Sequence, residues 1–293
     1  MSDTPTLGFI GLGVMGEPIC RNMLQKSGAT MLVSDLSPDP VARLKALGAE
    51  EASADDIAAR ADILFLSLPG GPQVEKVAGA LIPLMREGAT LVDMSTAPVG
   101  LTRELAAQAN ARGIHYADAP VARTRAAAEA GTLAIMVGAD PATHDRVLPI
   151  LSHAGDTILH CGPVGCGQVA KILNNMVLFQ NVVALSEALA LGQAAGMEGA
   201  TLFGIISQGS GDSFALRNHG QKAMIPDTFP KQAFPTDYAL KDVSYALDLA
   251  REYGLSAPGA ELAEARMQMA KAAGFAEEYF PVLARLAGNA TDV

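Results

Sequence analysis

Apolar residues in the first half of the chain recur in two patterns that alternate with each other. Seven runs of five to seven residues are apolar almost throughout, which is typical of strands covered by helices on both faces. The stretches between them are apolar on one side only, as in residues 98–113, which end at Gly113, a typical helix C-cap. The runs are residues 7–13, 30–35, 63–69, 90–95, 114–120, 133–138 and 157–161. This alternation predicts a mostly parallel, doubly wound sheet.

After residue 167 the short apolar runs stop. Residues 167–196 contain no proline and no internal glycine before Gly192, and they predict one long helix of about 40 Å at 1.5 Å per residue. Helical patterns follow at 236–254 and 258–274. We therefore predict an α/β protein with a doubly wound N-terminal domain, residues 1–163. The long helix joins it to an all-helical C-terminal domain, residues 164–293, for substrate binding and dimerisation.

Composition narrows the functional classes. The 293 residues carry a net charge of −10, which repels nucleic-acid phosphates, so we expect no nucleic-acid partner. The three cysteines and five histidines show no zinc-ligand spacing, so we expect no metal and no disulfide. The N-terminus shows no signal-peptide pattern, and no apolar run reaches the roughly 18 residues of a membrane span. We expect a cytoplasmic protein without a membrane partner.

A glycine pattern lies between the first predicted strand and the first predicted helix. In G-x-G-x-x-G, the first glycine permits a tight turn, the second admits a pyrophosphate to the backbone, and the third lets helix and strand pack closely. The triplet alone also fits an ordinary strand–helix turn, but its context predicts a Rossmann-type dinucleotide site at the helix N-terminus. The predicted cofactor loop consists of Gly11, Leu12, Gly13, Val14, Met15 and Gly16.

Asp35 ends the second apolar run, 19 residues after Gly16. A carboxylate at that strand end accepts hydrogen bonds from the ribose hydroxyls of NAD and repels a 2′-phosphate. Because no lysine or arginine follows within five residues, we predict NAD, with NADP the less favoured cofactor. The alternative is that Asp35 only caps the next turn.

Two later strand ends lie where doubly wound sheets bind ligands. They carry Leu68 with Pro69, and Ser95 with Thr96. We predict that these four residues contact the cofactor, although Thr96 could also cap the helix that follows.

Lys171 lies near the start of the long helix, with Asn174 and Asn175 three and four residues later on the same face. A lysine against apolar neighbours and beside two amides can polarise a carbonyl and pass a proton. The alternative is a solvated lysine beside surface asparagines. A dinucleotide site in the first domain favours the catalytic interpretation, because hydride transfer requires a group that handles the proton.

Motifs in this order resemble those of the β-hydroxyacid dehydrogenases, the family of the 3-hydroxyisobutyrate dehydrogenases. The segments of this chain that resemble family segments are GFIGLGVMGEPICRNML, DMSTAP, DAPV with GTLAIMVG, GPVGCGQVAKILNN and FPTDYALKDVSYALDLA. Together they extend over nearly the whole chain. The resemblance implies that Lys171 is the catalytic lysine and Asn175 its partner. It also implies that Phe234, Lys241 and Asp242 approach nicotinamide and substrate, with Phe234 and Lys241 also contacting the cofactor, and that the protein is a homodimer or homotetramer.

One segment departs from the family pattern. After Asp-Ala-Pro-Val the family has Ser-Gly-Gly, whose serine and amides hold the substrate carboxylate, and this chain has Ala122, Arg123 and Thr124. The Arg-Thr variant is similar to that of the 3-sulfolactaldehyde reductases of the same family, and an arginine fork suits an oxyanion. Sulfonate recognition is therefore one hypothesis. The alternatives are that Arg123 holds a carboxylate or, like Arg125, is a solvated loop charge.

We predict an NAD-dependent enzyme that transfers a hydride reversibly on a small anionic alcohol or aldehyde, such as 2,3-dihydroxypropane-1-sulfonate and 3-sulfolactaldehyde. Asn174, Asn175, Lys241 and Asp242 join the 122–124 loop as predicted substrate contacts. Phe214, Arg217 and Lys222 are further pocket candidates. The alternatives are a carboxylate-specific dehydrogenase of 3-hydroxyisobutyrate, tartronate semialdehyde or 4-hydroxybutyrate, and a non-catalytic NAD-binding interaction module.

Overall fold

The computed structural model describes residues 4–231 and 233–288, which belong to two compact units, Met1–Lys171 and Ile172–Val293. The division falls inside the long helix, after its first residues, whereas the sequence places the boundary before the helix. The reason is local: the first turn of the helix is hydrogen-bonded to two segments of the sheet domain, at Asp118 and at Ser95.

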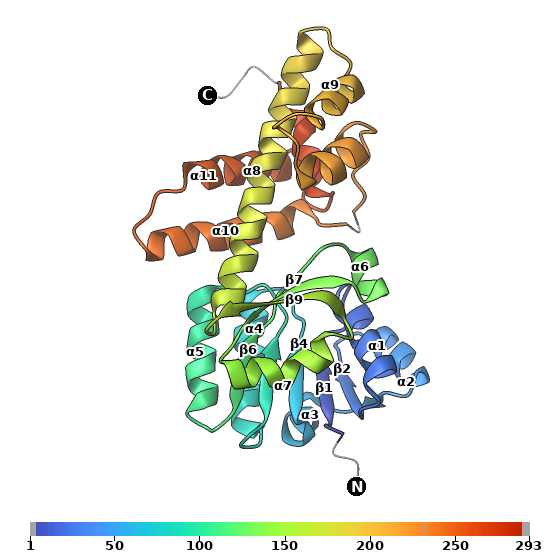
Figure 1. The fold of residues 1–293 in the computed structure, drawn as a ribbon, viewed down its shortest axis with the longest axis vertical. Coiled ribbons are helices and arrows are strands. Elements are labelled where there is room, and N and C mark those ends of the chain that lie inside the picture. The colour runs from blue at the N-terminus through green and yellow to red at the C-terminus, as the bar shows by residue number, and fades with distance from the viewer. Residues whose placement is uncertain (1–3, 232, 289–293) are drawn as a thin grey trace. The chain divides into compact units, whose positions relative to one another are not determined.

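A nine-stranded sheet forms the centre of the first unit (Figure 1). Its order is β3-β2-β1-β4-β5-β6-β8-β7, with β9 paired to β8, and all pairs are parallel except those of β8 with β6 and β7. The predicted doubly wound, mostly parallel sheet is thus confirmed. The strands are β1 (Leu7–Ile10), β2 (Met31–Ser34), β3 (Glu50–Glu51), β4 (Ile63–Leu66), β5 (Thr90–Asp93), β6 (His115–Asp118), β7 (Val121–Ala122), β8 (Leu133–Gly138) and β9 (Gly155–Gly162).

Successive residues of the central strands enter two different hydrophobic cores. Phe9 and Phe65 pack with helices on one face of the sheet, and Ile10 and Leu64 pack with helices on the other. Each strand is therefore apolar at consecutive positions, because both of its faces are covered. The first face holds α1 (Gly16–Ser27), α2 (Pro38–Ala46) and α7 (Pro141–Leu151), and the second α3 (Ala54–Arg60), α4 (Gly71–Leu81) and α5 (Val99–Asn110).

Two strands lie outside the seven apolar runs. β3 consists of two exposed glutamates at the sheet edge, and β7 consists of two half-buried residues paired with β8. Two-residue strands of this kind bury too few apolar groups to produce a sequence signal.

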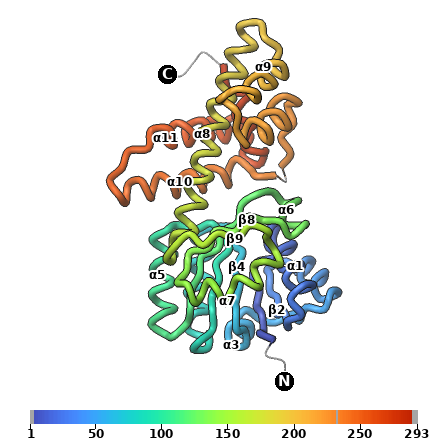
Figure 2. Tube along the Cα trace, viewed as in Figure 1, coloured from blue at the N-terminus to red at the C-terminus, as the bar shows by residue number. Residues whose placement is uncertain are grey.

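The second unit is built from helices, as predicted, and apart from the isolated bridge between Pro235 and Tyr279 its described residues form no strand. Its core contains Phe179, Phe203 and Phe280. Figure 2 shows α10 and α11 running side by side. The helical segments are α8 (Cys166–Ala194), which begins in the first unit, α9 (Gly199–Ile206), the π-helical segment Leu216–Met224, α10 (Thr236–Glu252), α11 (Pro258–Ala270), the π-helical segment Lys271–Phe275 and the 3₁₀ segment Phe280–Leu286.

Helix α8 is long and apolar enough, by length and composition, to cross a membrane, with a mean hydropathy of 1.3 in its most apolar window. The sequence contains no uninterrupted apolar run of about 18 residues, and α8 meets the criterion because its scattered polar residues interrupt the apolar runs without lowering the mean hydropathy much. Phe179, Val182 and Leu185 of α8 are buried in the helical core, as in a core helix of a globular domain.

Candidate active site

The three glycines of the first loop have different surroundings. Gly11 has φ of 94°, and a Cβ there would lie 2.3 Å from the Ser67 carbonyl oxygen. A Cβ at Gly16 would lie 2.0 Å from the Gly11 oxygen. A Cβ at Gly13, by contrast, would have no atom within 4 Å beyond its own chain neighbours. The protein's own packing therefore requires two of these glycines, and the open space at Gly13 fits a pyrophosphate against the backbone.

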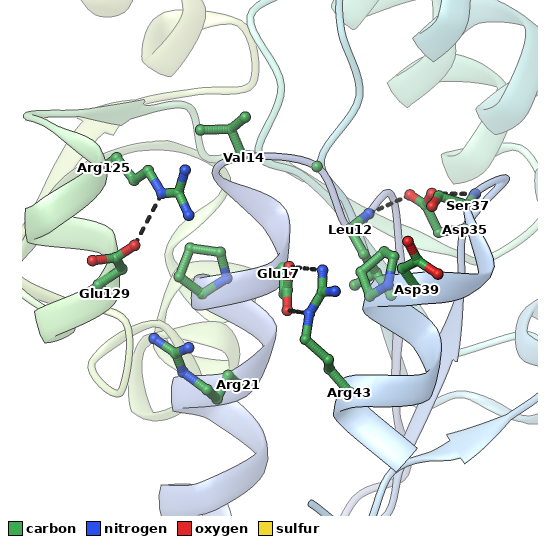
Figure 3. Close-up of a pocket in the computed structure, with 13 residues that line it drawn as sticks. Leu12, Val14, Glu17, Arg21, Asp35, Ser37, Asp39, Arg43, Arg125 and Glu129 are labelled. Carbon is green, nitrogen blue, oxygen red and sulfur yellow. Dashed lines mark hydrogen bonds and ion pairs between the residues drawn. The ribbon is translucent and has the colours of Figure 1, made fainter. Parts of the chain in front are cut away.

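Asp35 is fastened to the same loop. The Leu12 N–H donates to Oδ2 at 2.5 Å, and the Ser37 N–H donates to Oδ1 at 2.7 Å (Figure 3). These bonds fix the carboxylate beside the glycine loop, and each oxygen keeps a lone pair for a ribose hydroxyl. Asp35 therefore makes the turn contact of the alternative interpretation and is also oriented to accept from a ligand.

A groove of about 590 Å³ lies along this loop. Arg43 in the groove donates to Glu17 through Nε at 2.6 Å and Nη2 at 2.8 Å, and this hydrogen bonding lowers the pKa of Glu17 (Figure 3). Arg43 follows Asp35 by eight residues, outside the five-residue stretch where a cofactor-selecting cation was expected, and no spacing pattern marks Glu17 as its partner. The lining consists of Leu12, Gly13, Val14, Glu17, Pro18, Arg21, Asp35, Ser37, Asp39, Pro40, Arg43, Arg125 and Glu129.

The two later strand ends are joined to each other. The Leu68 N–H donates to Ser95 Oγ at 2.9 Å, and the Ser95 side chain is buried. Pro69, which follows Leu68, is exposed, and Thr96, which follows Ser95, is half-buried. Helix α5 has Pro98 at its N-cap, with no capping side chain, so Thr96 does not cap that helix.

The start of helix α8 is held by a buried carboxylate that belongs to the DAPV segment but was not among the predicted site residues. Asp118, at the end of β6, accepts hydrogen bonds from the backbone N–H groups of Gly165 and Gln168, both at 2.7 Å. Burial raises the pKa of Asp118 to about 6, while the backbone N–H groups act in the opposite direction. The carboxylate thus caps the helix that carries Lys171.

Lys171 is half-buried on α8, and Asn175 follows one helical turn later. Asn175 is buried, and its Nδ2 donates to Asp242 Oδ2 at 2.7 Å. Lys241 Nζ lies 3.2 Å from the other oxygen of Asp242. In the helical unit the structure thus brings together three of the predicted residues, Asn175, Lys241 and Asp242. Asn174 is exposed and donates to the Asn175 side-chain oxygen at 3.1 Å.

Phe234 is half-buried in an aromatic cluster of the helical unit. Its ring lies 5.9 Å from that of Phe179 and 5.5 Å from that of Phe280, between ring centroids. The cluster fixes the orientation of Phe234 by edge and tilted contacts.

The chain leaves β7 at Ala122 and is conformationally constrained at the next residue. Arg123 has φ of 83°, a left-handed conformation in which glycine is favoured. Its guanidinium donates to Asp156 Oδ1 at 2.6 Å, to Thr157 Oγ1 at 2.9 Å and to the Thr132 carbonyl. Hydrogen bonds from Thr157 and then Arg123 lower the pKa of Asp156. An incoming anion would therefore compete with Asp156 for this arginine.

The other residues of this region have local partners. Ala122 lies in β7, the Thr124 side chain caps α6 (Arg125–Ala130), and Arg125 pairs with Glu129. In the helical unit, Arg217 pairs with Asp212, Lys222 donates to Asn218, and Phe214 is half-exposed. Among residues 4–231 and 233–288, no cluster of three or more His, Cys, Asp or Glu side chains could hold a metal ion.

Known proteins resemble this chain along nearly its whole length. Residues 6–162 match the family described as the NAD binding domain of 6-phosphogluconate dehydrogenase, and residues 165–286 match NAD-binding of NADP-dependent 3-hydroxyisobutyrate dehydrogenase. The chain is 37% identical over 282 residues to 2-(hydroxymethyl)glutarate dehydrogenase of Eubacterium barkeri, covering 95% of this chain and 93% of that protein. It is 34% identical over 289 residues to NAD-dependent L-serine dehydrogenase of Pseudomonas aeruginosa, covering 96% and 97%.

A solved structure leads to the same family. Mycobacterium tuberculosis 3-hydroxyisobutyrate dehydrogenase with L-serine has a TM-score of 0.90 and 31% identity to this chain, and the match covers 97% of this chain and 99% of that one. The chain therefore belongs to the β-hydroxyacid dehydrogenase family and is an NAD-dependent oxidoreductase that acts on hydroxyl groups.

The contrast between two glycines can be tested by alanine substitution. Gly13→Ala places its methyl group in open space, so we expect thermal stability close to wild type and NADH affinity at least about tenfold weaker, because the methyl blocks the pyrophosphate. Gly16→Ala pushes a methyl group against the Gly11 carbonyl and should lower the melting temperature by several degrees. NADH fluorescence titration and thermal unfolding measure both effects. Wild-type NADH affinity in Gly13→Ala would contradict this assignment.

Burial of Asp118 predicts a pH dependence of stability. The pKa is raised from 3.8 in the unfolded chain to about 6 in the folded protein, so the unfolded chain loses the proton first and this group destabilises the fold as pH rises. Between about pH 4.5 and pH 7.5, wild type should lose about 2 kcal/mol of unfolding free energy relative to Asp118→Asn, which cannot titrate there. Urea unfolding at both pH values measures the difference. If the difference in unfolding free energy between wild type and Asp118→Asn is the same at both pH values, or changes in the opposite direction, the pKa of Asp118 is not raised.

Proposed function

We propose that this enzyme oxidises the primary alcohol of a small 2-substituted 3-hydroxypropanoate, reversibly, with NAD as the hydride acceptor. The observation that carries the proposal is the arrangement along α8, where half-buried Lys171 is followed one turn later by Asn175, itself bound to Asp242. The named relatives support the substrate class. 2-(Hydroxymethyl)glutarate, L-serine and 3-hydroxyisobutyrate all carry a CH₂OH group on the carbon next to a carboxylate.

The residues of the first unit fit a bound dinucleotide. The open backbone at Gly13 suits the pyrophosphate, and the Asp35 carboxylate suits the ribose hydroxyls. Arg43 would favour a 2′-phosphate, but Glu17 occupies its Nε and one Nη. We therefore propose NAD rather than NADP as the preferred cofactor.

Lys171 accepts the hydroxyl proton during alcohol oxidation and returns it during reduction. Asn175 orients the reacting oxygen, and the hydrogen bond from its Nδ2 to Asp242 fixes the orientation of its own amide. Asp242 accepts the hydrogen bond from this amide and also forms an ion pair with Lys241. The pair keeps the Lys241 ammonium group close to Asn175.

A sulfonate substrate is the second candidate, and Arg123 is the observation that favours it. A guanidinium followed by a threonine hydroxyl replaces two glycines of the family pattern, and this pair suits an oxyanion with three acceptor oxygens. The carboxylate candidate is preferred because Asp156, Thr157 and Thr132 already satisfy that guanidinium.

The function is tested by the rate of NAD+ reduction with four alcohols. The panel is 3-hydroxyisobutyrate, L-serine, 2-(hydroxymethyl)glutarate and 2,3-dihydroxypropane-1-sulfonate. Lys171→Ala should lower kcat on the best substrate by about 10²- to 10⁴-fold, the usual contribution of a general base, with NADH affinity retained. Lys45→Ala, a surface ion-pair lysine, is the matched control and should behave as wild type.

A kcat close to wild type in Lys171→Ala would show that Lys171 is not the general base. A kcat/KM at least about tenfold higher with the sulfonate than with every carboxylate, or about 1.4 kcal/mol in the transition state, would replace the carboxylate proposal by the sulfonate one. No NAD+ reduction with any of the four would reject the proposed substrate class.

Cofactor preference is tested at Asp35. Asp35→Ser removes the charge that repels a 2′-phosphate and keeps a hydroxyl near the ribose, so kcat/KM should fall with NAD+ and rise with NADP+, each by about tenfold. Adding Glu17→Gln should raise the NADP+ value further, because it releases Arg43. If the ratio of NADP+ to NAD+ kcat/KM does not change in Asp35→Ser, Asp35 does not select the cofactor.

A further inference from the structure

Gln168 is a fully buried amide in the first turn of helix α8, and the proposed mechanism does not use it. Its Oε1 accepts a hydrogen bond from the Ala97 N–H at 3.1 Å, and its Nε2 donates to the Ser95 carbonyl at 2.8 Å. These two backbone groups flank Thr96, which the sequence predicts to contact the cofactor, and residues 95–97 are called the cofactor segment below. One side chain thus fastens that segment to the helix that carries Lys171.

The turn that bears Gln168 is itself held from a second direction. Asp118 accepts from the backbone N–H of Gln168 and of Gly165. The approach is so close that a Cβ at Gly138 or Gly167 would lie 2.4 Å or 2.7 Å from a carboxylate oxygen of Asp118. The end of β6, the segment after β5 and the first turn of α8 therefore form one hydrogen-bonded body, all within the first compact unit.

We propose that Gln168 is a positioning residue that fixes the Ser95–Ala97 backbone to the turn preceding Lys171, and so sets the catalytic amine relative to the cofactor segment. The inference rests on the proposed function. The chemistry requires glutamine, because one side chain must accept from an N–H and donate to a carbonyl at the same time. An ionised glutamate has no donor for the Ser95 carbonyl, and an apolar side chain leaves both backbone groups unpaired in a buried place.

The first experiment compares Gln168→Ala with Asn22→Ala. Asn22 is the control: it is buried in the same unit, and its Nδ2 donates to backbone carbonyls, of Pro18 at 3.0 Å, Ala128 at 2.9 Å and Glu129 at 3.4 Å. Both variants should lose thermal stability to a similar extent. At a temperature where both are folded, and at saturating NAD+ and 3-hydroxyisobutyrate (or the best alcohol of the panel), Gln168→Ala should show kcat lowered at least about tenfold and Asn22→Ala a kcat near wild type.

NADH titration supplies a readout that needs no substrate. Gln168→Ala should bind NADH about three- to tenfold more weakly, and Asn22→Ala should bind it as wild type does. If wild type binds NADH but oxidises no alcohol of the panel, the proposed function fails while this titration still decides the role of Gln168. Loss of stability in Gln168→Ala with kcat and NADH affinity both unchanged would overturn the proposal and leave Gln168 a folding residue only.

The pH dependence of Gln168→Glu tests whether the side chain at position 168 must donate a hydrogen bond to the Ser95 carbonyl. The protonated carboxyl group of this variant can replace both amide hydrogen bonds, whereas the ionised form cannot donate to Ser95. Asp118 and Asp93, the acidic groups hydrogen-bonded to the same segments, disfavour a further negative charge there. The ratio of variant to wild-type kcat should therefore rise as pH falls, and a pH-independent ratio would contradict the donor role.

Discussion

A buried carboxylate at the end of one strand determines where the longest helix of this protein begins. Asp118 lies at the carboxyl end of β6, and the first N–H groups of α8 converge on it. Such groups have no partner inside their own helix, so an acceptor supplied by the sheet satisfies them and complements the helix dipole. Burial opposes the charge and raises the pKa of Asp118 to about 6. The fold therefore keeps a carboxylate that burial disfavours, because the hydrogen bonds from the start of α8 offset part of that cost.

Glycine has two roles around these anchors, and only the surroundings distinguish them. At Gly16, Gly138 and Gly167 a Cβ would overlap backbone or carboxylate atoms, so the residue is required by the protein's own packing. At Gly13 the neighbouring space is open. A glycine that packing does not require, in a loop that also orients a carboxylate toward a groove, indicates room for a ligand. The motif letters are the same in both cases, and the distinction needs the fold.

The sequence predicted the parts of this protein that depend on local patterns. Consecutive apolar residues identified the central strands, and the absence of glycine and proline identified α8. The pairing of Asn175 with Asp242 joins residues 67 positions apart, and that of Glu17 with Arg43 joins residues 26 apart. Neither leaves a spacing signal. Gln168 was not predicted for the same reason. A glutamine near a helix start carries no sequence signal of its own, and its two partners lie more than 70 residues earlier in the chain.

Arg123 shows how a substitution can keep a loop's shape and redirect its charge. The family pattern has glycine here, and the arginine adopts a glycine-like φ of 83°, a conformation that costs a non-glycine residue about 1–2 kcal/mol. Three hydrogen bonds from its guanidinium, to Asp156, Thr157 and Thr132, offset that cost and draw the side chain to β9 and the segment before β8. The backbone at Arg123 thus keeps a geometry that glycine would adopt, while Asp156 pairs with the positive charge. For Arg123 to select a sulfonate, that anion would have to displace a carboxylate already bound to it, so specificity at this loop depends on Asp156 as much as on the arginine.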